Sequence, residues 1–163
     1  MYTLGIITSS DKGSKGQRED KSGEVIKKIP EAKGFKLERY TILPDERVKL
    51  SEEMKYMADE LNLDLILTTG GTGFSERDIT PEATKDVIEK EALGIAEAIR
   101  NYSFTITKRA MLSRGTAGIR KRTLIVNMPG SPKACEEILD YILEDLKHGL
   151  DIMKGSASEC ARK

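Results

Sequence analysis

One stretch of the chain, residues 63–82, constrains the fold more than any other. It begins with a nearly continuous apolar run and passes through the turn Gly70-Gly71-Thr72-Gly73 into Thr80-Pro81. Such an apolar run is typical of a strand that is covered on both faces, as in a parallel sheet. Thr80 is expected to cap the next helix and Pro81 to be its first residue, because proline is favoured there. The stretch predicts a strand, a glycine turn and a helix N-terminus in succession.

This junction has two interpretations. In open α/β sheets, ligands bind outside the carboxyl ends of the strands, and the N–H groups of a helix N-terminus favour an anion such as phosphate. Glycine turns also follow buried strands in proteins that bind nothing there. This turn matches neither the dinucleotide-binding fingerprint nor the phosphate loop that ends in Gly-Lys-Ser/Thr. On spacing alone, an anion site and a structural turn explain the residues equally well.

The same design recurs late in the chain, and this repetition is more informative than either copy. Residues 123–128 predict a second buried strand, which ends in Pro129-Gly130, and Ser131-Pro132 repeats the cap and proline of a helix start. The helix that follows is expected to bury Cys135 and to end at Gly155. If the two strands are neighbours, their turns could hold two phosphate groups or the two ends of one ligand.

The rest of the chain alternates between strand and helix patterns. Strands are expected over 2–8 and 35–43, and helices over 22–31, 46–61, 81–91 and 95–102, whereas 108–122 indicates a loop with room for a short edge strand. Alternating strands and helices predict a three-layer α/β/α single domain with a mainly parallel sheet. We expect this domain to span residues 1–155 and residues 156–163 to form a frayed tail.

Composition excludes several classes of function. Lys plus Arg and Asp plus Glu number 27 each, so the basic excess of a nucleic-acid or membrane-surface protein is missing. The sequence shows no long apolar segment and no N-terminal signal pattern, which predicts a cytoplasmic protein. Cys135 and Cys160 form no paired motif, so a disulfide framework or structural zinc is not expected. His148 is the only histidine and falls in a predicted helix, which excludes a histidine-based triad elsewhere.

Two further polar segments are expected at the ligand edge of the sheet. Residues 9–23 form a long polar loop after the first strand, and a loop of this length favours a function, although a solvated mobile loop explains it equally well. Asp45 follows the second strand after Pro44, where a helix cap is the competing interpretation. The loop residues that could reach an anionic ligand are Ser9, Ser10, Lys12, Lys15 and Lys21.

The ordered motifs of the chain resemble those of one family. They are Ser10-Asp11, Asp20-Lys21-Ser22-Gly23, Leu43-Pro44-Asp45, Thr68-Thr69-Gly70-Gly71-Thr72-Gly73, Arg77-Asp78-Ile79-Thr80-Pro81-Glu82-Ala83-Thr84, Leu112-Ser113-Arg114 and Pro129-Gly130-Ser131-Pro132. Each motif is weak alone. In this order, over nearly the whole chain, they are similar to the MogA/MoaB family, which makes molybdenum cofactor. Gephyrin and plant cofactor-synthesis proteins carry similar domains.

The resemblance implies a molybdopterin adenylyltransferase with a mixed-sheet α/β/α fold of the MoaB/Mog type. The terminal phosphate of molybdopterin would attack the α-phosphorus of ATP, and pyrophosphate would leave, with magnesium as the metal. The family also implies a homotrimer, with a hexamer as the alternative, and hand-over of the product to the molybdenum-insertion protein; neither a nucleic acid nor a membrane is expected as a partner. A MoaB-type molybdopterin-binding paralogue or a scaffold module with little or no catalysis remains the alternative.

The resemblance also implies the site residues. Asp45 and Asp78 match the two critical aspartates of the family and, if they follow adjacent strands, could hold hydrated Mg²⁺. Lys21, Arg77 and Arg114 are candidates for neutralising phosphate charge. Ser131 stands where the family commonly has asparagine. The expected substrate- and nucleotide-binding residues are Ser9, Asp11, Lys21, Ser22, Gly70, Gly71, Thr72, Gly73, Thr80, Ser113, Arg114, Pro129, Gly130, Ser131 and Pro132.

Overall fold

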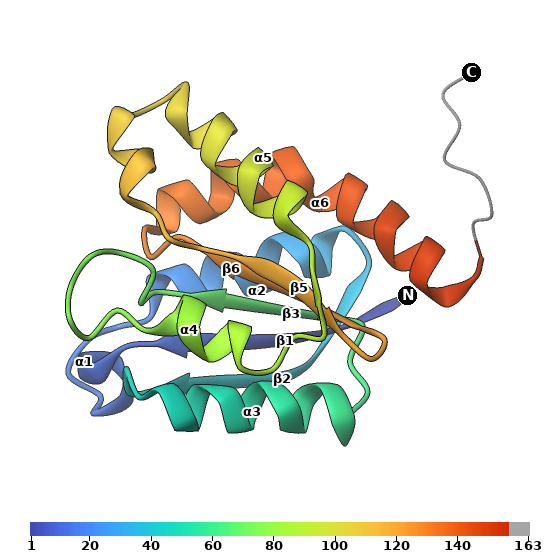
Figure 1. Cartoon of the computed structure of the whole chain (residues 1–163), viewed down its shortest axis with the longest axis horizontal. Helices are drawn as coiled ribbons and strands as arrows, with labels where there is room; N and C mark the ends of the chain where they lie inside the picture. Colours follow the sequence, from blue (N-terminus) through green and yellow to red (C-terminus); the bar gives the residue numbers. More distant parts are fainter. Residues whose placement is uncertain (157–163) are drawn as a thin grey trace.

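The structure, a computed structural model that describes residues 1–156, is built around a mixed sheet. In this part of the chain the sheet has six strands in the order β2-β1-β3-β6-β5-β4 (Figure 1). Strands β2, β1, β3 and β6 run parallel, whereas β5 pairs antiparallel with β6, and β4 with β5. The predicted mainly parallel, mixed sheet is confirmed. The strands are β1 Tyr2–Ser9, β2 Phe35–Leu43, β3 Leu65–Thr69, β4 Lys90–Glu91, β5 Ala117–Arg120 and β6 Thr123–Met128.

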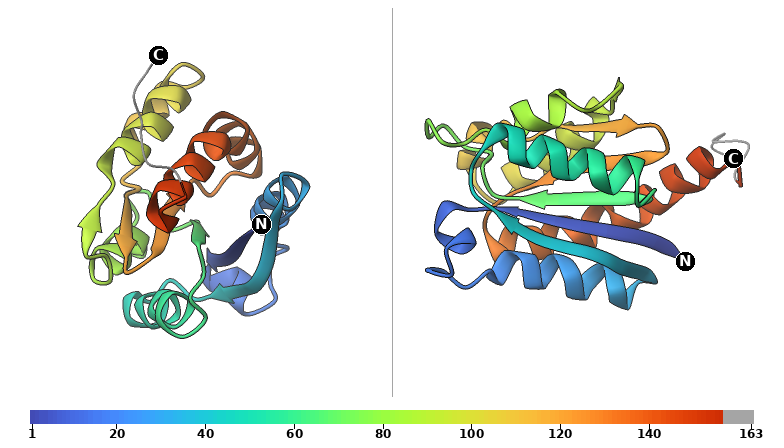
Figure 2. Two further views of the ribbon diagram at one scale, coloured as in Figure 1. Left: turned by 90° about the vertical axis from the view of Figure 1, so that its right-hand side faces the viewer. Right: turned by 90° about the horizontal axis from the view of Figure 1, so that it is seen from below.

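Helices cover both faces of this sheet and give the three predicted layers (Figure 2). One face carries α2 (Lys21–Ala32), α5 (Leu93–Phe104) and α6 (Pro132–Lys154), and the other carries α3 (Arg47–Asp59) and α4 (Thr80–Lys85). Leu65 and Leu67 of β3 join the first core, and Ile66 joins the second. Successive strand residues point to opposite faces, so the continuous apolar run of β3 contributes to both cores.

Two short helical segments lie outside these layers. Helix α1 (Asp11–Ser14) follows β1, and the 3₁₀ helix η1 (Lys108–Leu112) lies between α5 and β5. The polar segment 9–23 therefore contains a helical turn and the start of α2. None of the helices in residues 1–156 combines the length and the apolar character that crossing a bilayer requires. Of the tail expected over 156–163, all but Ser156 lies outside the described residues.

The helix predicted over 81–91 is wrong beyond its first turns. Helix α4 ends at Lys85, and the chain then forms the two-residue strand β4. Lys90 and Glu91 pair with Ile119 and Gly118 of β5, so β4 rather than β5 lies at the edge of the sheet. Pairing between segments about thirty residues apart overrides local helix propensity, which periodicity alone does not reveal.

The two predicted helix starts have different outcomes. Ser131 caps α6 as expected, since its hydroxyl accepts from the backbone N–H of Ala134, and α6 ends at the left-handed Gly155. The prediction that Thr80 is a cap is wrong: Thr80 is already helical, and its hydroxyl donates to the carbonyl of Gly70 at 2.9 Å. Thr80 therefore connects the start of α4 to the glycine turn.

Candidate active site

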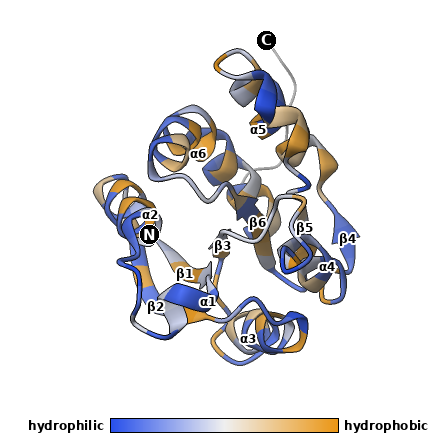
Figure 3. Ribbon diagram, turned by 90° about the vertical axis from the view of Figure 1, so that its left-hand side faces the viewer, coloured by the Kyte–Doolittle hydropathy of each residue, from blue (hydrophilic) through white to orange (hydrophobic). Residues whose placement is uncertain are grey.

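A cleft of about 680 Å³ opens at the carboxyl edge of the parallel strands. Figure 3 looks onto this edge, where α1 and the loops that follow the strands gather. Residues from the ends of β1, β2, β3 and β6 meet in the lining. The cleft therefore lies where open α/β sheets bind ligands. Its lining includes the expected site residues Ser9, Lys21, Ser22, Asp45, Gly70, Gly71, Asp78, Gly130 and Pro132.

The other expected binding residues lie behind or beside this lining. Thr72 and Thr80 are buried, and Pro129 accepts through its carbonyl from the Thr69 hydroxyl at 2.6 Å. Ser131 serves as the cap of α6. The residues absent from the lining are Asp11, Thr72, Gly73, Thr80, Ser113, Arg114, Pro129 and Ser131.

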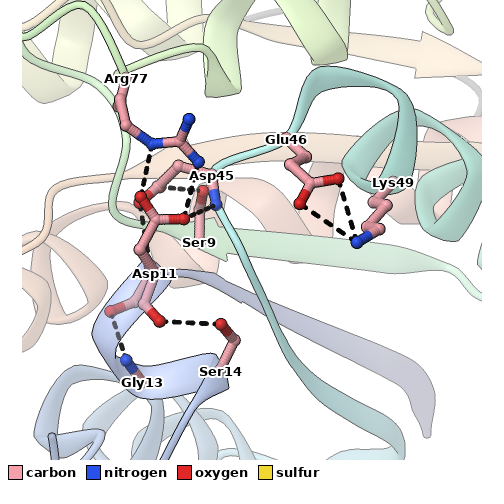
Figure 4. Close-up of polar contacts among 9 residues, drawn as sticks. Ser9, Asp11, Gly13, Ser14, Asp45, Glu46, Lys49 and Arg77 are labelled. Atoms are coloured by element: carbon pink, nitrogen blue, oxygen red, sulfur yellow. Dashed lines mark hydrogen bonds and ion pairs between the residues drawn. The ribbon is translucent and has the colours of Figure 1, made fainter. Parts of the chain in front are cut away.

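Asp45 is held by a set of reciprocal hydrogen bonds from the end of β1. Its carboxylate accepts from the Ser9 hydroxyl at 2.6 Å and from the backbone N–H of Asp11 at 3.0 Å. In return, the backbone N–H of Asp45 donates to the Asp11 carboxylate at 3.0 Å (Figure 4). The cap of α3 is Glu46, so the competing interpretation of Asp45 as a helix cap is wrong. These bonds fix the carboxylate of Asp45 at the cleft.

Asp11 links this set to the loop that follows β3. The Arg77 guanidinium donates to both Asp11 carboxylate oxygens, at 2.5 and 2.8 Å (Figure 4). The hydrogen bond from Arg77 lowers the pKa of Asp11 to about 2; burial opposes the shift, whereas the Asp45 backbone N–H and the nearby Lys15 add to it. The ends of β1, β2 and β3 are thereby joined through charged groups.

The expectation that Asp45 and Asp78 follow adjacent strands is wrong. Strand β1 lies between β2 and β3, so Ser9 stands between the two aspartates in strand order. Both carboxylates nevertheless line the one cleft. The two glycine turns do follow neighbouring strands, because β3 pairs directly with β6.

The glycine turn leaves room for Asp78 and for the end of β1. Gly70 has φ 86°, and a Cβ there would collide with the carbonyl oxygen of Ser9. A Cβ on Gly73 would lie 2.8 Å from a carboxylate oxygen of Asp78. That same oxygen accepts from the backbone N–H of Ser75 at 2.9 Å. Gly70 is therefore required for steric reasons, whereas a side chain at Gly73 would displace the Asp78 carboxylate.

The cations near the cleft fall into two groups. Arg77 is paired with Asp11, and Arg114 is paired with Glu82. Lys21 and Arg18 line the cleft, and neither has a carboxylate partner among residues 1–156. Sequence reasoning did not single out Arg18, because one arginine in a charged loop carries no pattern.

Asp20 also lines the cleft, although it was not among the site residues expected from the sequence. Its carboxylate caps α2 by accepting from the backbone N–H of Gly23 at 2.9 Å, and it also accepts from the Thr8 hydroxyl at 2.5 Å and from the Tyr40 hydroxyl. Burial, followed by the hydrogen bond to Asp20, raises the pKa of Tyr40. An Asp in front of a helix pattern is a cap signal, and it would have placed the start of α2 one residue earlier.

A buried side-chain amide, that of Asn127, connects several of the elements that form the cleft. Asn127 is 3% exposed, and its side-chain amide donates to the Thr68 and Thr84 hydroxyls at 3.0 and 2.9 Å. Its side-chain oxygen accepts from the backbone N–H of Thr116 at 3.1 Å. Asn127 thus joins β6, β3, α4 and the segment before β5. This role could not be predicted from the sequence, because a single polar residue within an apolar strand forms no recognisable pattern.

The carboxylates fit a magnesium ion better than a transition metal. The part of the chain that the structure describes has no group of three or more His, Cys, Asp or Glu side chains that could hold a metal. Mg²⁺ instead needs only one or two protein carboxylates together with substrate phosphates and water. Asp45 and Asp78 provide such a pair at the cleft, and all of their carboxylate oxygens retain acceptor capacity.

Comparison with known proteins identifies the family. The profile described as "Probable molybdopterin binding domain" matches residues 5–148. The molybdopterin adenylyltransferase of Helicobacter pylori strain J99 is 40% identical over 162 residues, covering 98% of this chain and 92% of that protein. The molybdopterin biosynthesis enzyme MoaB of Thermus thermophilus superposes with a TM-score of 0.89 at 43% identity over 95% of this chain and 98% of that one. The tungsten cofactor synthesizing protein MoaB of Pyrococcus furiosus superposes with a TM-score of 0.84 at 36% identity over 94% and 98%. The chain belongs to the MogA/MoaB family of molybdopterin-binding proteins.

Proposed function

We propose that the protein is a molybdopterin adenylyltransferase, a nucleotidyltransferase of molybdenum cofactor biosynthesis. It transfers AMP from ATP to the terminal phosphate of molybdopterin and releases pyrophosphate. The observation that carries the proposal is the cleft in which Asp45, Asp78 and the turns of β3 and β6 meet. Relatives that bear this name support the proposal. The reaction also requires neither a histidine base nor a cysteine nucleophile, and the cleft lining formed by residues 1–156 contains neither residue.

The backbone of the two glycine turns would bind the phosphate groups. The backbone at Gly70 and Gly71, and that at Gly130, line the cleft side by side because β3 and β6 are paired. Backbone N–H groups at such turns bind phosphate oxygens. Lys21 and Arg18 provide positive charge in the lining, and neither forms an ion pair with a carboxylate of residues 1–156. These groups hold the ATP phosphates and the terminal phosphate of molybdopterin close together.

Asp45 and Asp78 would hold Mg²⁺, which neutralises charge on the reacting phosphates when it is bound. Ser9 and the backbone of Asp11 fix the Asp45 carboxylate, and the backbone of Ser75 fixes that of Asp78. The attacking phosphate oxygen is already anionic near neutral pH, so no side chain has to remove a proton. It forms a bond to the α-phosphorus as the bond to the pyrophosphate oxygen breaks. The protein contributes positioning and electrostatic stabilisation.

The proposal includes the partners that the family implies. A homotrimer, with a hexamer as the alternative, has support in the apolar side chains exposed from the end of α5 through η1. Phe104, Ile106, Met111 and Leu112 are 47%, 53%, 60% and 45% exposed. The product would pass to the molybdenum-insertion protein. A tungsten pathway is the alternative that the Pyrococcus furiosus relative raises, since that protein is named for tungsten cofactor synthesis.

The test is the incorporation of AMP into molybdopterin by the purified protein with ATP and MgCl₂. Asp78→Asn should lower turnover by about a hundredfold or more, because a metal supplies several kcal/mol of charge stabilisation. Molybdopterin binding by that variant should remain within a few-fold of wild type. Wild-type turnover in Asp78→Asn would refute the metal role. A wild-type protein that binds molybdopterin but forms no product would be a MoaB-type binding paralogue or scaffold module.

A further inference from the structure

The side chain of a single arginine, Arg114, bridges two points of the loop that carries Asp78. This loop, residues 70–79, leaves β3 and returns as α4. The Arg114 guanidinium donates to the carbonyl of Gly73 at 2.8 Å through Nε and to the carbonyl of Asp78 at 2.6 Å through Nη2. The two carbonyls lie at opposite ends of the exposed segment 74–77. One planar group therefore sets the width of the loop.

Arg114 is itself fixed from three directions. Glu82, in the first turn of α4, accepts from both terminal nitrogens of its guanidinium. The backbone N–H of Arg114 donates to the carbonyl of Thr72 at 2.9 Å. Next along the chain, the Gly115 carbonyl accepts from Arg100 at 2.6 Å. The position of Arg114 is thus set by the body of the domain and not by the loop alone.

The guanidinium has little capacity left for a ligand. Its hydrogen bonds to Gly73, Asp78 and Glu82 occupy Nε and both terminal nitrogens. Burial alone would raise the pKa of Glu82, but the hydrogen bond from Arg114, followed by a backbone hydrogen bond and the charges of Arg114 and Lys85, lowers it below its ordinary value. Arg114 is also absent from the residues that line the cleft, whereas Arg18 and Lys21 line it without a carboxylate partner in residues 1–156.

We propose that Arg114 is a positioning residue that holds the Asp78 loop in its reactive geometry, and that it does not bind the substrate phosphates. The inference rests on the proposed adenylyl transfer. A guanidinium is suited to this role because its planar fork reaches two carbonyls and a carboxylate at once, which the point charge of a lysine ammonium cannot do. Arg114 thereby acts on catalysis through Asp78.

The experiment compares steady-state kinetics of Arg114→Lys, Arg114→Met and Glu82→Gln with wild type. If Arg114 positions the loop, kcat falls by about tenfold to a hundredfold in both Arg114 variants, while KM for ATP and for molybdopterin stays within about twofold. Glu82→Gln leaves the cation but loosens its orientation, so it lowers kcat by a smaller factor. If Arg114 instead binds phosphate, its variants raise KM and Glu82→Gln leaves kcat unchanged, and the proposal is overturned.

Arg120→Lys is the matched control for a purely structural loss. Arg120 also spans two elements, donating to the Val87 carbonyl and to both carboxylate oxygens of Asp59, but it lines no part of the cleft. It should lower the melting temperature without changing kcat. A fall in kcat with Arg120→Lys as large as with Arg114→Lys would mean that lost stability explains both, which would overturn the proposal.

Hydrogen exchange gives a readout that does not depend on activity. In Arg114→Met, the amides of Ser75 and Asp78 should exchange at least about tenfold faster than in wild type, while those of β3 and β6 keep their protection. Unchanged exchange in the loop would overturn the proposal that Arg114 holds the loop, even if the variant were inactive. If the wild-type protein itself forms no product, the proposed function fails, and loop exchange still decides whether Arg114 holds the loop.

Discussion

Asp11 is the residue through which the loops after β1, β2 and β3 are electrostatically joined. The pair with Arg77 is exposed, its two side chains being 58% and 32% accessible, so its effect on global stability should be small. Its effect on the titration of Asp11 should be large, because the guanidinium donates to both carboxylate oxygens. The pair is therefore best tested through the ionisation of Asp11.

We predict that Arg77→Ala raises the pKa of Asp11 from about 2 toward its ordinary value of 3.8. Since the folded-state pKa is lowered, the pair stabilises the fold fully above about pH 3.8 and is lost as the pH falls through about 2. It should therefore persist throughout the neutral range. The check is an NMR titration of the Asp11 carboxyl carbon in both proteins. An identical midpoint in Arg77→Ala would contradict the assigned cause.

Cys135 should be inert to thiol reagents in the folded protein. It is fully buried, and burial raises the pKa of its thiol to about 12, partly offset by the hydrogen bond with Thr69. The thiolate that attacks such reagents is therefore nearly absent at pH 8. In a Cys160→Ser background, we expect Cys135 to react with dithionitrobenzoate only after denaturant is added. Stoichiometric labelling without denaturant would show that the start of α6 opens readily.

Among the structural elements, those with local signals could be predicted and those made by distant pairing could not. Strands β1, β2 and β6 carry continuous or β-branched runs, and α6 carries both a Ser-Pro start and a glycine end, so their predicted bounds agree with the structure to within about a residue. Strand β4 is two residues long and exists only because β5 lies beside it. No local pattern encodes that contact.

The same distinction applies to the site. The carboxyl-edge position of Asp45 and Asp78 followed from the parallel sheet, but their strand order did not, because β1 enters between β2 and β3 only through the crossovers. Arg114 and Ser113 were expected at the ligand; neither is among the residues that line the cleft, and the Arg114 guanidinium bonds the carbonyls of Gly73 and Asp78. A sequence motif identifies which residues matter together without saying which of them face the cavity.

The Asn127 network is the internal support that joins these elements. We predict that Asn127→Ala lowers the free energy of unfolding by about 2 to 4 kcal/mol, because it removes three buried hydrogen bonds, those to the Thr68 and Thr84 hydroxyls and that from the Thr116 N–H. Urea unfolding measures this change. Thr123→Val is the control, since it removes a single buried bond to the Leu63 carbonyl and should cost about 1 kcal/mol. Equal losses in the two variants would contradict a network role.

At the scale of the whole molecule, the surface from the end of α5 through η1 distinguishes one side of the domain. Four large apolar side chains, Phe104, Ile106, Met111 and Leu112, are each more than two-fifths exposed within a span of nine residues. Scattered apolar side chains need no explanation, but a group this dense is typical of a protein interface. A net charge of zero also provides little electrostatic repulsion between copies.

We predict that the wild-type protein is a trimer in light scattering and that Ile106→Lys together with Met111→Glu shifts it toward a monomer, because burying those charges at an interface is costly. Val48→Lys on α3 is the matched control: Val48 is 66% exposed and lies on the opposite layer, so its replacement should leave the mass unchanged. Adenylyl transfer measured on the same samples shows whether assembly matters for the cleft. A monomeric wild type, or a double variant that stays trimeric, would mean that this surface does not hold the copies together.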